Sequence, residues 1–349
     1  MTIRKLVVLL LAAAVCGVAI TSAVRNPEHA DLDAAARRGV PGKFVTLGDG
    51  VTHYDVQGPD SGQRVLLAHG FSVPSYIWDS TVTALTGAGF RVARYDYFGR
   101  GYSDRPDVRY TADLYDRQML QLLDSLGWRG PVDVVGLSMG GPVTAEFVGR
   151  HPERVRSLTL VDPAAGTRTA PPLPFRVPLI GPILWQTFAV PSMAAGQLTD
   201  FVEPAKWPDW PARYRVQMQY RGFGRALLST LREGEGNVLD SVYARVGALG
   251  KPTLLIWGML DSTVTIDHAD GVRKAIPQAQ YHPIERAGHL PQMERTDVVN
   301  PLLIAFLRSQ TPADSSDKRT ASSVDMPNCS ARVTINRLTT SSSAPPRYP

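Results

Sequence analysis

The sequence predicts an α/β domain with a mostly parallel central sheet of about eight strands, flanked by helices and carrying an inserted helical cap. Short apolar runs alternate with segments of helical periodicity, as expected for a sheet that is covered on both faces. One such run, 132–135, leads into a glycine-flanked serine, and a helical pattern follows at once. A segment rich in proline and tryptophan, 164–235, interrupts the alternation and predicts the cap.

The composition is that of a globular chain. Of the 349 residues, 44% are hydrophobic and 20% are charged, and the net charge is +5 at pH 7. The basic residues are scattered, so we find no pattern typical of nucleic-acid binding. Two cysteines, Cys16 and Cys329, lie near the two ends, which leaves the predicted domain without disulfides or thiolate metal ligands. We expect neither a metal nor a cofactor.

The two ends of the chain differ from its body. Two basic residues precede an uncharged run from Leu6 to Ala23, a pattern typical of an export signal. Its length approaches that of a bilayer span, so residues 1–24 predict a retained membrane anchor, with a cleaved signal peptide as the alternative. Residues 25–42 are polar and predict a connector. Residues 311–349 are dominated by Ser, Thr, Pro and Ala and predict a disordered tail.

The first part of the core, 43–163, is predicted to begin with a hairpin around Gly48-Asp49-Gly50. A helix is expected at 111–126, because its apolar residues share one face and Gly127 follows it. The second part, 236–310, is expected to end with a helix from about 297 to 307. Strands are predicted at 44–47, 51–56, 64–68, 91–97, 132–135, 157–161, 252–257 and 280–284.

The segment 164–235 carries nine prolines among large apolar side chains. The prolines interrupt the segment, which we expect to be a mostly helical insertion. The aromatic residues are expected to pack against one another while the segment covers a site on the core.

Residues 136–141 read Gly-Leu-Ser-Met-Gly-Gly and match the G-x-S-x-G pattern of a nucleophile elbow. In this motif a strand, a sharp turn and a helix present the serine at the apex. Gly136 and Gly140 flank a backbone that is too tight for side chains. The pattern is weak alone, since an ordinary serine in a glycine-rich turn also matches it. Its context makes Ser138 the predicted nucleophile.

A serine hydroxyl is a weak nucleophile and needs a base beside it that a third group orients. Of the seven histidines, His289 lies in a suitable late loop, directly after a strand, and is the predicted base. Asp261 is the predicted acid because it follows a strand and completes the order Ser…Asp…His. Asp162, at the end of the preceding strand, is the alternative acid, and otherwise a structural carboxylate.

Acyl transfer also needs hydrogen-bond donors for the oxyanion of the tetrahedral intermediate. The N–H that follows the nucleophile belongs to Met139, and the earlier strand–helix loop offers the N–H of Phe71. Gly70 allows that loop to approach the substrate closely. His69 is expected to be a structural imidazole next to this oxyanion loop.

Taken together, these motifs resemble those of the α/β-hydrolase fold superfamily over residues 43–310. The resemblance is specific for the fold and much less so for the substrate. It implies a capped, cofactor-free serine hydrolase, similar to monoacylglycerol-lipase-like esterases and to the carbon–carbon bond hydrolases of aromatic degradation. It also implies a charge-stabilised turn for Asp96 and Arg100. The motifs that carry it are His69-Gly70-Phe71, Asp96–Ser103, Gly136–Gly141, Trp257–Asp261 and Ala287-Gly288-His289.

The expected function is hydrolysis of a carboxylic ester of a lipophilic small molecule, such as a monoacylglycerol, through an acyl-enzyme on Ser138. The apolar cap and the membrane-proximal leader favour a lipophilic substrate and an exported, membrane-anchored or secreted protein. One alternative keeps the triad but cleaves a carbon–carbon bond of meta-cleavage type. Another is a non-catalytic ligand-binding member of the fold, which the complete triad disfavours. A proline iminopeptidase fits less well, because the cap shows no acidic cluster for a free amine.

Overall fold

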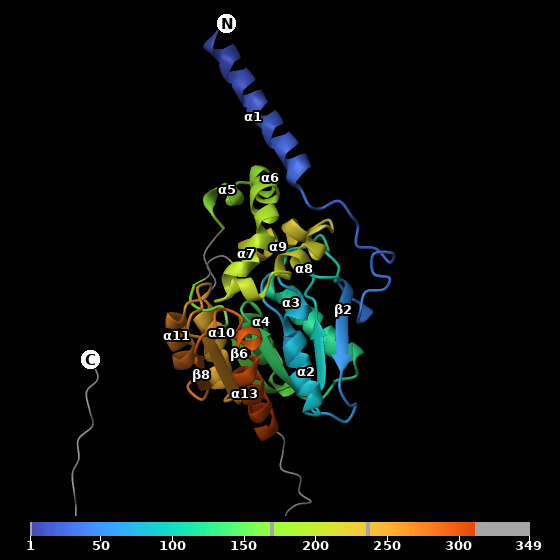
Figure 1. Ribbon diagram of the computed structural model, residues 1–349, viewed down its shortest axis with the longest axis vertical. Coiled ribbons are helices and arrows are strands. Elements are labelled where there is room, and N and C mark those ends of the chain that lie inside the picture. The colour runs from blue at the N-terminus through green and yellow to red at the C-terminus, as the bar shows by residue number, and fades with distance from the viewer. Residues whose placement is uncertain (1, 168–170, 235–237, 311–349) are drawn as a thin grey trace, which may run out of the picture. The chain divides into compact units, whose positions relative to one another are not determined.

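The structure is a computed structural model that describes residues 2–167, 171–234 and 238–310 (Figure 1). Its centre is one eight-stranded sheet with the order β1-β2-β4-β3-β5-β6-β7-β8. The β1–β2 and β2–β4 pairs are antiparallel and all other neighbouring pairs are parallel, which confirms the predicted sheet. The strands are β1 (Lys43–Leu47), β2 (Gly50–Gln57), β3 (Arg64–Ala68), β4 (Arg91–Tyr95), β5 (Val132–Leu137), β6 (Val155–Val161), β7 (Thr253–Gly258) and β8 (Gln280–Ile284).

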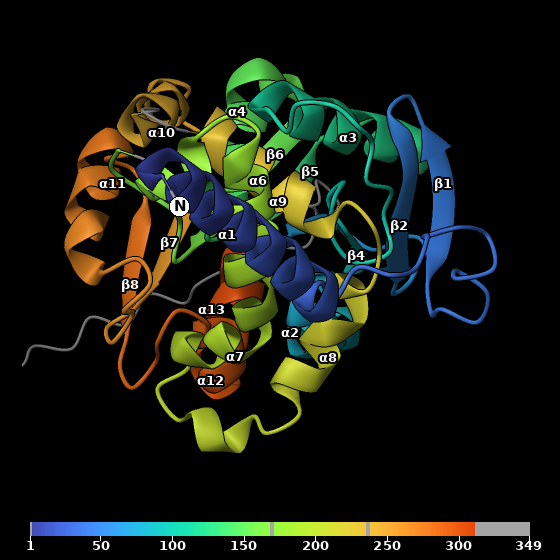
Figure 2. The ribbon, with the colours of Figure 1, turned by 90° about the horizontal axis from the view of Figure 1, so that it is seen from above.

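Helices cover both faces of the sheet (Figure 2). Side chains alternate along each strand, so successive residues of β3 enter different cores. Leu66 packs with α3, α4, α10 and α11 on one face, whereas Val65 and Leu67 pack with α2 and α13 on the other. These helices are α2 (Asp79–Gly87), α3 (Ala112–Ser125), α4 (Gly140–Arg150), α10 (Leu239–Ala248), α11 (Ala269–Ala275) and α13 (Thr296–Ser309).

Helix α3 illustrates how local sequence sets an element. The Thr111 side chain accepts a hydrogen bond from Leu114 N and caps the first turn. Leu114, Met119 and Leu122 share one buried face. Gly127 adopts a φ of 68°, which a residue with a side chain rarely tolerates, and the chain leaves the helix there. The predicted helix at 111–126 is confirmed to within a residue at each end.

Between β6 and α10 the described residues form short helices, gathered over one end of the sheet (Figure 1). Phe201 stacks on Trp207 and meets Trp210 edge-on, so these aromatic side chains pack against one another as expected. The helices named in the figure are α5 (Leu173–Arg176), α6 (Ile180–Leu184), α7 (Met193–Gly196), α8 (Trp210–Met218) and α9 (Phe223–Glu233).

The N-terminal segment forms the helix α1 (Ile3–Arg25). Within the residues that the structure describes, no helix has the length and apolar character needed to cross a membrane. The predicted connector is tied to the helical segment through Glu28, whose carboxylate accepts hydrogen bonds from Gly222 N and Gly224 N, each 2.7 Å long. These donors lie at the start of α9, where a negative charge is favourable. The predicted tail at 311–349 lies outside the described residues.

Candidate active site

All predicted site residues follow strands at the same edge of the sheet. Phe71 follows β3, Ser138 and Met139 follow β5, Asp261 follows β7 and His289 follows β8. In a parallel sheet, ligands bind beyond this carboxyl edge.

Ser138 occupies the tip of the turn between β5 and α4 with a φ of 52°, a strained conformation for a residue with a side chain. The turn is held by hydrogen bonds from Ser138 N to Val161 O (3.0 Å) and from Gly141 N to Ser138 O (2.9 Å). A Cβ added at Gly140 would lie 2.6 Å from two backbone oxygens of the β3 end, so only glycine fits there. The local geometry is that of a nucleophile elbow.

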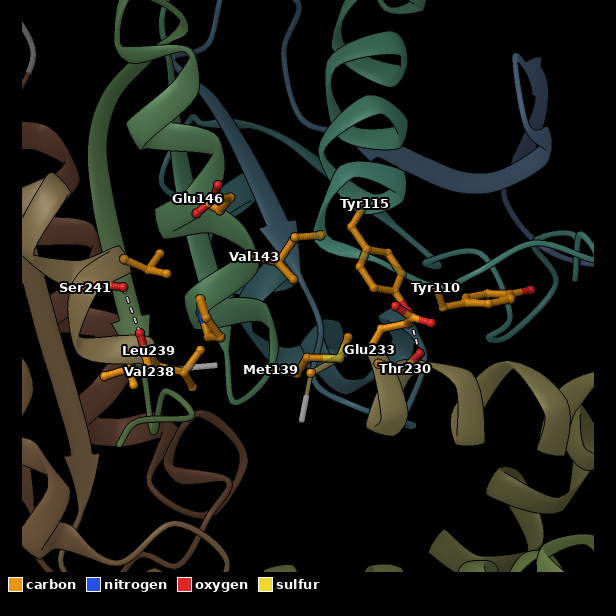
Figure 3. A pocket seen from close by; sticks show the side chains of 14 residues that line it. Tyr110, Tyr115, Met139, Val143, Glu146, Thr230, Glu233, Val238, Leu239 and Ser241 are labelled. Atoms are coloured by element: carbon orange, nitrogen blue, oxygen red, sulfur yellow. Dashed lines mark hydrogen bonds between the residues drawn. The ribbon is translucent and has the colours of Figure 1, made fainter. Parts of the chain in front are cut away.

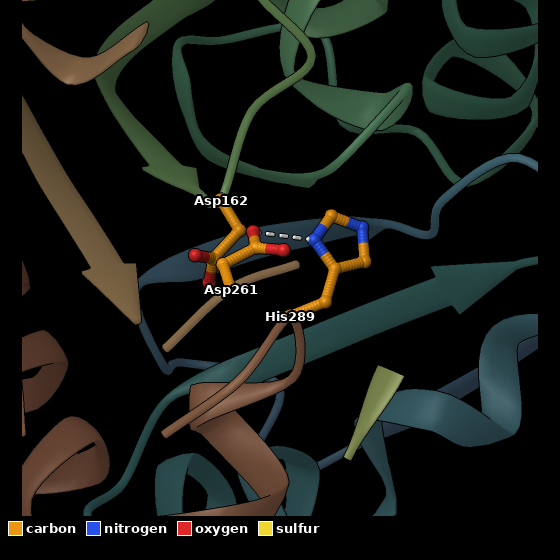
Figure 4. A group of neighbouring side chains, drawn as sticks. All are labelled: Asp162, Asp261 and His289. Carbon is orange, nitrogen blue, oxygen red and sulfur yellow. Dashed lines mark hydrogen bonds and ion pairs between the residues drawn. The ribbon is translucent and has the colours of Figure 1, made fainter. Parts of the chain in front are cut away.

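His289 and Asp261 form a buried acid–base pair (Figure 4). The imidazole Nδ1 donates to Asp261 Oδ2 over 2.7 Å. The other carboxylate oxygen accepts from Thr263 N at 2.8 Å and Val264 N at 2.9 Å, which fixes its orientation. With Nδ1 as the donor, Nε2 of His289 is left as the proton acceptor. Burial lowers the pKa of His289, but the hydrogen bond and charge of Asp261 outweigh it, and the pKa is raised above its ordinary value.

Ser138 and His289 line the same cavity, which has a volume of about 180 Å³ and is also bordered by Phe71. Among the described contacts, no hydrogen bond joins the Ser138 hydroxyl to His289. Catalytic hydrogen bonds often tighten only when substrate is bound. The structure therefore brings nucleophile and base to one cavity without pairing them.

The charged groups around this cavity are unevenly distributed. Among its described lining residues, Asp200 and His289 are titratable and none is Lys or Arg. Asp200 comes from the segment over the sheet, and its backbone oxygen accepts a hydrogen bond from His289 N (3.0 Å). Burial raises the pKa of Asp200. The sequence analysis did not identify Asp200 as a site residue. It could have stood out because it is the first acidic residue after Asp162, in a segment expected to cover the site.

The oxyanion loop approaches Ser138 closely: a Cβ added at Gly70 would lie 3.2 Å from Ser138 Cβ. Within the described part of the chain, no hydrogen bond uses the N–H of Phe71 or of Met139, so both are available as donors. His69 supports the loop by donating from Nδ1 to Gly70 O at 2.8 Å, while its Nε2 accepts from Tyr97 N at 3.0 Å.

These two hydrogen bonds require a neutral His69, in which one ring nitrogen carries a proton and the other accepts a hydrogen bond. Burial lowers the pKa of His69 to about 4, which agrees. His69 is thus a structural imidazole of the oxyanion loop, as expected.

Asp96 and Arg100 do not pair with each other, but both bond to the turn that the resemblance implies. Asp96 Oδ2 accepts from Tyr102 N over 2.9 Å, and Arg100 donates to Phe98 O over 3.1 Å. Asp96 binds His53 Nδ1 over 2.8 Å. Arg100 is fully buried and donates to Phe71 O at 2.8 Å and, through its other nitrogens, to neighbouring oxygens including Thr230 Oγ1. Its charge therefore supports the oxyanion loop as well as the turn.

Gln217, from α8, is a second contact between the helical segment and the oxyanion loop. Its Nε2 donates to Ser72 O over 2.8 Å, and its Oε1 accepts from Gly101 N over 2.9 Å. Nothing in the sequence distinguishes this glutamine from the others, because its partners are backbone groups more than a hundred residues away.

A second cavity of about 270 Å³ begins at Met139, on the α4 side of the elbow (Figure 3). Val143 and Leu239 form apolar walls, and Glu146 and Glu233 lie at its border. Its described lining, like that of the first cavity, includes no Lys or Arg.

Asp162, the alternative acid, lies beside Asp261 (Figure 4). One carboxylate oxygen of Asp162, one of Asp261 and one ring nitrogen of His289 all lie within 4.8 Å of one another. Asp162 Oδ1 accepts from Gly258 N over 2.7 Å, whereas the hydrogen bond to the imidazole belongs to Asp261. Both acids are therefore at the site, and Asp261 is the one that contacts the base.

A family model described as alpha/beta hydrolase fold matches residues 63–296. The chain is 29% identical over 286 residues to a 2-hydroxy-6-oxononadienedioate/2-hydroxy-6-oxononatrienedioate hydrolase of Cupriavidus pinatubonensis, covering 76% of this chain and 94% of the relative. It is 28% identical over 263 residues to Lipase 1 of Psychrobacter immobilis, covering 73% and 80%. A solved meta-cleavage product hydrolase of Pseudomonas fluorescens IP01 superposes with a TM-score of 0.64 at 26% identity, covering 77% of this chain and 98% of that one.

Proposed function

Because the chain belongs to the alpha/beta hydrolase fold family, we propose that it is a serine hydrolase that cleaves a carboxylic ester of a lipophilic substrate. The observation that carries this proposal is one cavity bordered by Ser138, by the Asp261-bound His289 and by the oxyanion loop. The sequence resemblance and the names of the relatives support hydrolysis as the reaction class.

In the proposed reaction Ser138 Oγ attacks the ester carbonyl while Nε2 of His289 takes the hydroxyl proton. Asp261 holds the resulting imidazolium through Nδ1, and the N–H groups of Phe71 and Met139 donate to the oxyanion. His289 then gives the proton to the leaving alcohol. Water, deprotonated by the same imidazole, attacks the acyl-enzyme. The imidazolium then returns this proton to Ser138 Oγ as the carboxylic acid leaves.

The substrate class is inferred from the charge and polarity of the two cavities. Neither offers a described Lys or Arg to a substrate carboxylate, and Asp200 would repel an anion in the catalytic cavity. A neutral ester avoids this cost. The apolar side chains that border the catalytic cavity, Phe71, Val73, Ile77, Leu137 and Leu290, suit a lipophilic group.

Carbon–carbon bond hydrolysis is the second candidate, because several relatives carry such names. One is the 2-hydroxy-6-oxo-6-phenylhexa-2,4-dienoate hydrolase of Burkholderia cepacia, 26% identical over 285 residues. The substrates in these names are anions, and a catalytic cavity whose described lining contains Asp200 and no Lys or Arg places them second here.

Purified protein assayed with p-nitrophenyl esters of rising chain length and with 2-hydroxy-6-oxo-6-phenylhexa-2,4-dienoate separates the two activities. We expect ester turnover that increases with chain length and little cleavage of the dienoate. The reverse result would reject the ester in favour of the carbon–carbon bond. A protein that turns over neither substrate and does not react with a fluorophosphonate probe would be a non-catalytic, ligand-binding member of the fold.

We also infer that the chain is exported and associates with the membrane through residues 1–24. The basic start and apolar run support this, as do exposed apolar side chains of α1 such as Ile3 and Leu10. Cell fractionation of the full chain with a C-terminal tag tests it. A full-length product in the membrane fraction is expected. A shortened product in the soluble exported fraction would indicate a cleaved signal, and a full-length soluble cytosolic product would reject export.

A further inference from the structure

Two carboxyl groups lie buried side by side behind the imidazole of His289 (Figure 4). Asp261 contacts the imidazole. Asp162, which directly follows the neighbouring strand β6, lies beside Asp261. Asp162 adopts a φ of 40° and donates its N–H to Ile256 O (3.0 Å), so its backbone is fixed at the junction of β6 and β7. The reaction described above assigns no role to this second carboxyl.

The hydrogen-bond partners of the two acids are unequal. Asp261 accepts from three donors: His289 Nδ1, Thr263 N and Val264 N. Asp162 accepts from one, Gly258 N at Oδ1, and its Oδ2 is buried with no partner among the described atoms. Two adjacent buried carboxyls cannot both be ionised without a large cost, so they share a proton. Asp261, which accepts more hydrogen bonds, is the better place for the negative charge. Oδ2 of Asp162, which has no described partner, is the better place for the proton.

We propose that Asp162 is a positioning residue that carries this proton and donates a hydrogen bond from Oδ2 to the Asp261 carboxylate. The donated bond completes the coordination of Asp261 and holds it against Nδ1 of His289. It also draws electron density from Asp261, which limits how strongly that carboxylate stabilises the imidazolium before substrate arrives. The inference deepens the proposed function, on which it rests only in taking His289 as the base.

The charges around the pair favour a neutral Asp162. The titratable groups that face it are Asp261, His289 and Glu294, and Asp200 faces His289 from the helical segment. Two of these carboxyls, Asp261 and Glu294, thus act on Asp162 itself. Burial and the charge of Asp261 raise the pKa of Asp162 well above its ordinary value, in agreement with the geometry.

Two variants test whether Asp162 is a neutral hydrogen-bond donor or an ionised carboxylate. Asp162→Asn keeps the shape, the acceptor for Gly258 N and an N–H donor toward Asp261, but cannot be charged. Asp162→Leu has a side chain of similar volume but removes both the acceptor for Gly258 N and the donor toward Asp261. The imidazole pKa of His289 is measured by NMR titration, and the rate at which a fluorophosphonate labels Ser138 is measured in parallel.

For Asp162→Asn we expect an unchanged imidazole pKa and a labelling rate within about threefold of the wild type, because the donor is kept. For Asp162→Leu we expect a higher imidazole pKa and labelling slower by about tenfold at neutral pH. A fall of about one pH unit in the imidazole pKa of Asp162→Asn would show that the wild-type residue is ionised and would overturn the proposal.

An Asp162→Leu protein that is folded and matches the wild type in both measurements would overturn it equally. If Asp162→Leu does not fold, the isosteric Asp162→Asn protein still decides between the neutral and the ionised state. The titration needs no substrate. If wild-type protein fails to label, the proposed function fails while the NMR result still tests the state of Asp162.

Discussion

At the residue scale, Ser138 is the group whose removal should abolish the reaction without unfolding the protein. Its hydroxyl forms no hydrogen bond among the described residues, and alanine can follow the same backbone. We expect Ser138→Ala to lower kcat by about a millionfold while the melting temperature stays within a few degrees. Ester turnover and thermal unfolding are measured together. Ser125→Ala, at the exposed end of α3, is the matched serine control and should keep full activity.

The protonation of His289 predicts how activity depends on pH. Only the neutral imidazole can take the Ser138 proton, and its raised pKa keeps the ring protonated to a higher pH than in an ordinary histidine. The value of kcat/KM should therefore fall as the pH drops through a point above about 6.5, the ordinary histidine value. A pH–rate profile on a neutral ester measures this. A profile that stays flat down to pH 5 would contradict the role of His289.

Predictability from sequence differs between residues of the site. Ser138, Asp261 and His289 lie in loops directly after strands, where motif and chain order are visible in one sequence. Asp200 and Gln217 come from short helices whose placement depends on packing between segments far apart in the chain. Asp96 and Arg100 illustrate the same limit, because the resemblance implied their role in a turn but not their distant partners, His53 for one and the Phe71 carbonyl for the other.

At the element scale, the strands and the long helices follow from local patterns. Helix α3 has a cap, an amphipathic face and a terminating glycine, so its bounds could be predicted closely. The short helices of 164–235 have no comparable periodicity. Their ends are set by prolines and by tertiary contacts such as the Phe201–Trp207 stack, so the sequence predicted helices there but not their number or bounds.

Helix α8 couples the helical segment to the catalytic loop through Gln217. Replacing Gln217 with Met keeps the side-chain volume but leaves Ser72 O and Gly101 N unpaired in a buried place. We expect kcat to fall by about tenfold with a smaller change in KM, and the free energy of unfolding to fall by about 2 kcal/mol. Gln219→Met is the control, since this partly exposed side chain, directly after α8, donates to Val216 O of that helix and contacts no catalytic loop among the described hydrogen bonds. Equal behaviour of the two variants would contradict the coupling.

At the scale of the whole molecule, His53 joins three separate parts of the chain. It lies on β2, its Nδ1 binds Asp96 after β4, and its Nε2 binds Pro41 O of the predicted connector, each over 2.8 Å. Because both partners are acceptors, both nitrogens must carry protons, and the ring is an imidazolium. Burial lowers the pKa of His53, but the charge and hydrogen bond of Asp96 more than offset it and raise the pKa.

This charge makes stability depend on pH in a direction that can be calculated. A pKa raised by folding means that the contribution of His53 is fully present below the unfolded value of about 6.5 and is lost as the pH rises through the folded value. The pKa of Asp96 is lowered by its partner, so its contribution is present above the unfolded value of about 3.8 and is lost in acid. The pair therefore stabilises the fold most between about pH 4 and pH 6.5.

Replacing His53 with Gln tests this dependence, because the amide can donate one of the two hydrogen bonds but carries no charge. We expect the free energy of unfolding to fall by about 2 kcal/mol at pH 6 and by less at pH 8.5, because the wild-type imidazole loses protons as the pH rises through its raised pKa. Urea unfolding at the two pH values measures the difference. His268→Gln, on an exposed ring, should change stability little at either pH. A His53→Gln loss that is the same at both pH values would mean that the ring contributes through its shape and neutral hydrogen bonds, and that no imidazolium joins the connector to the core.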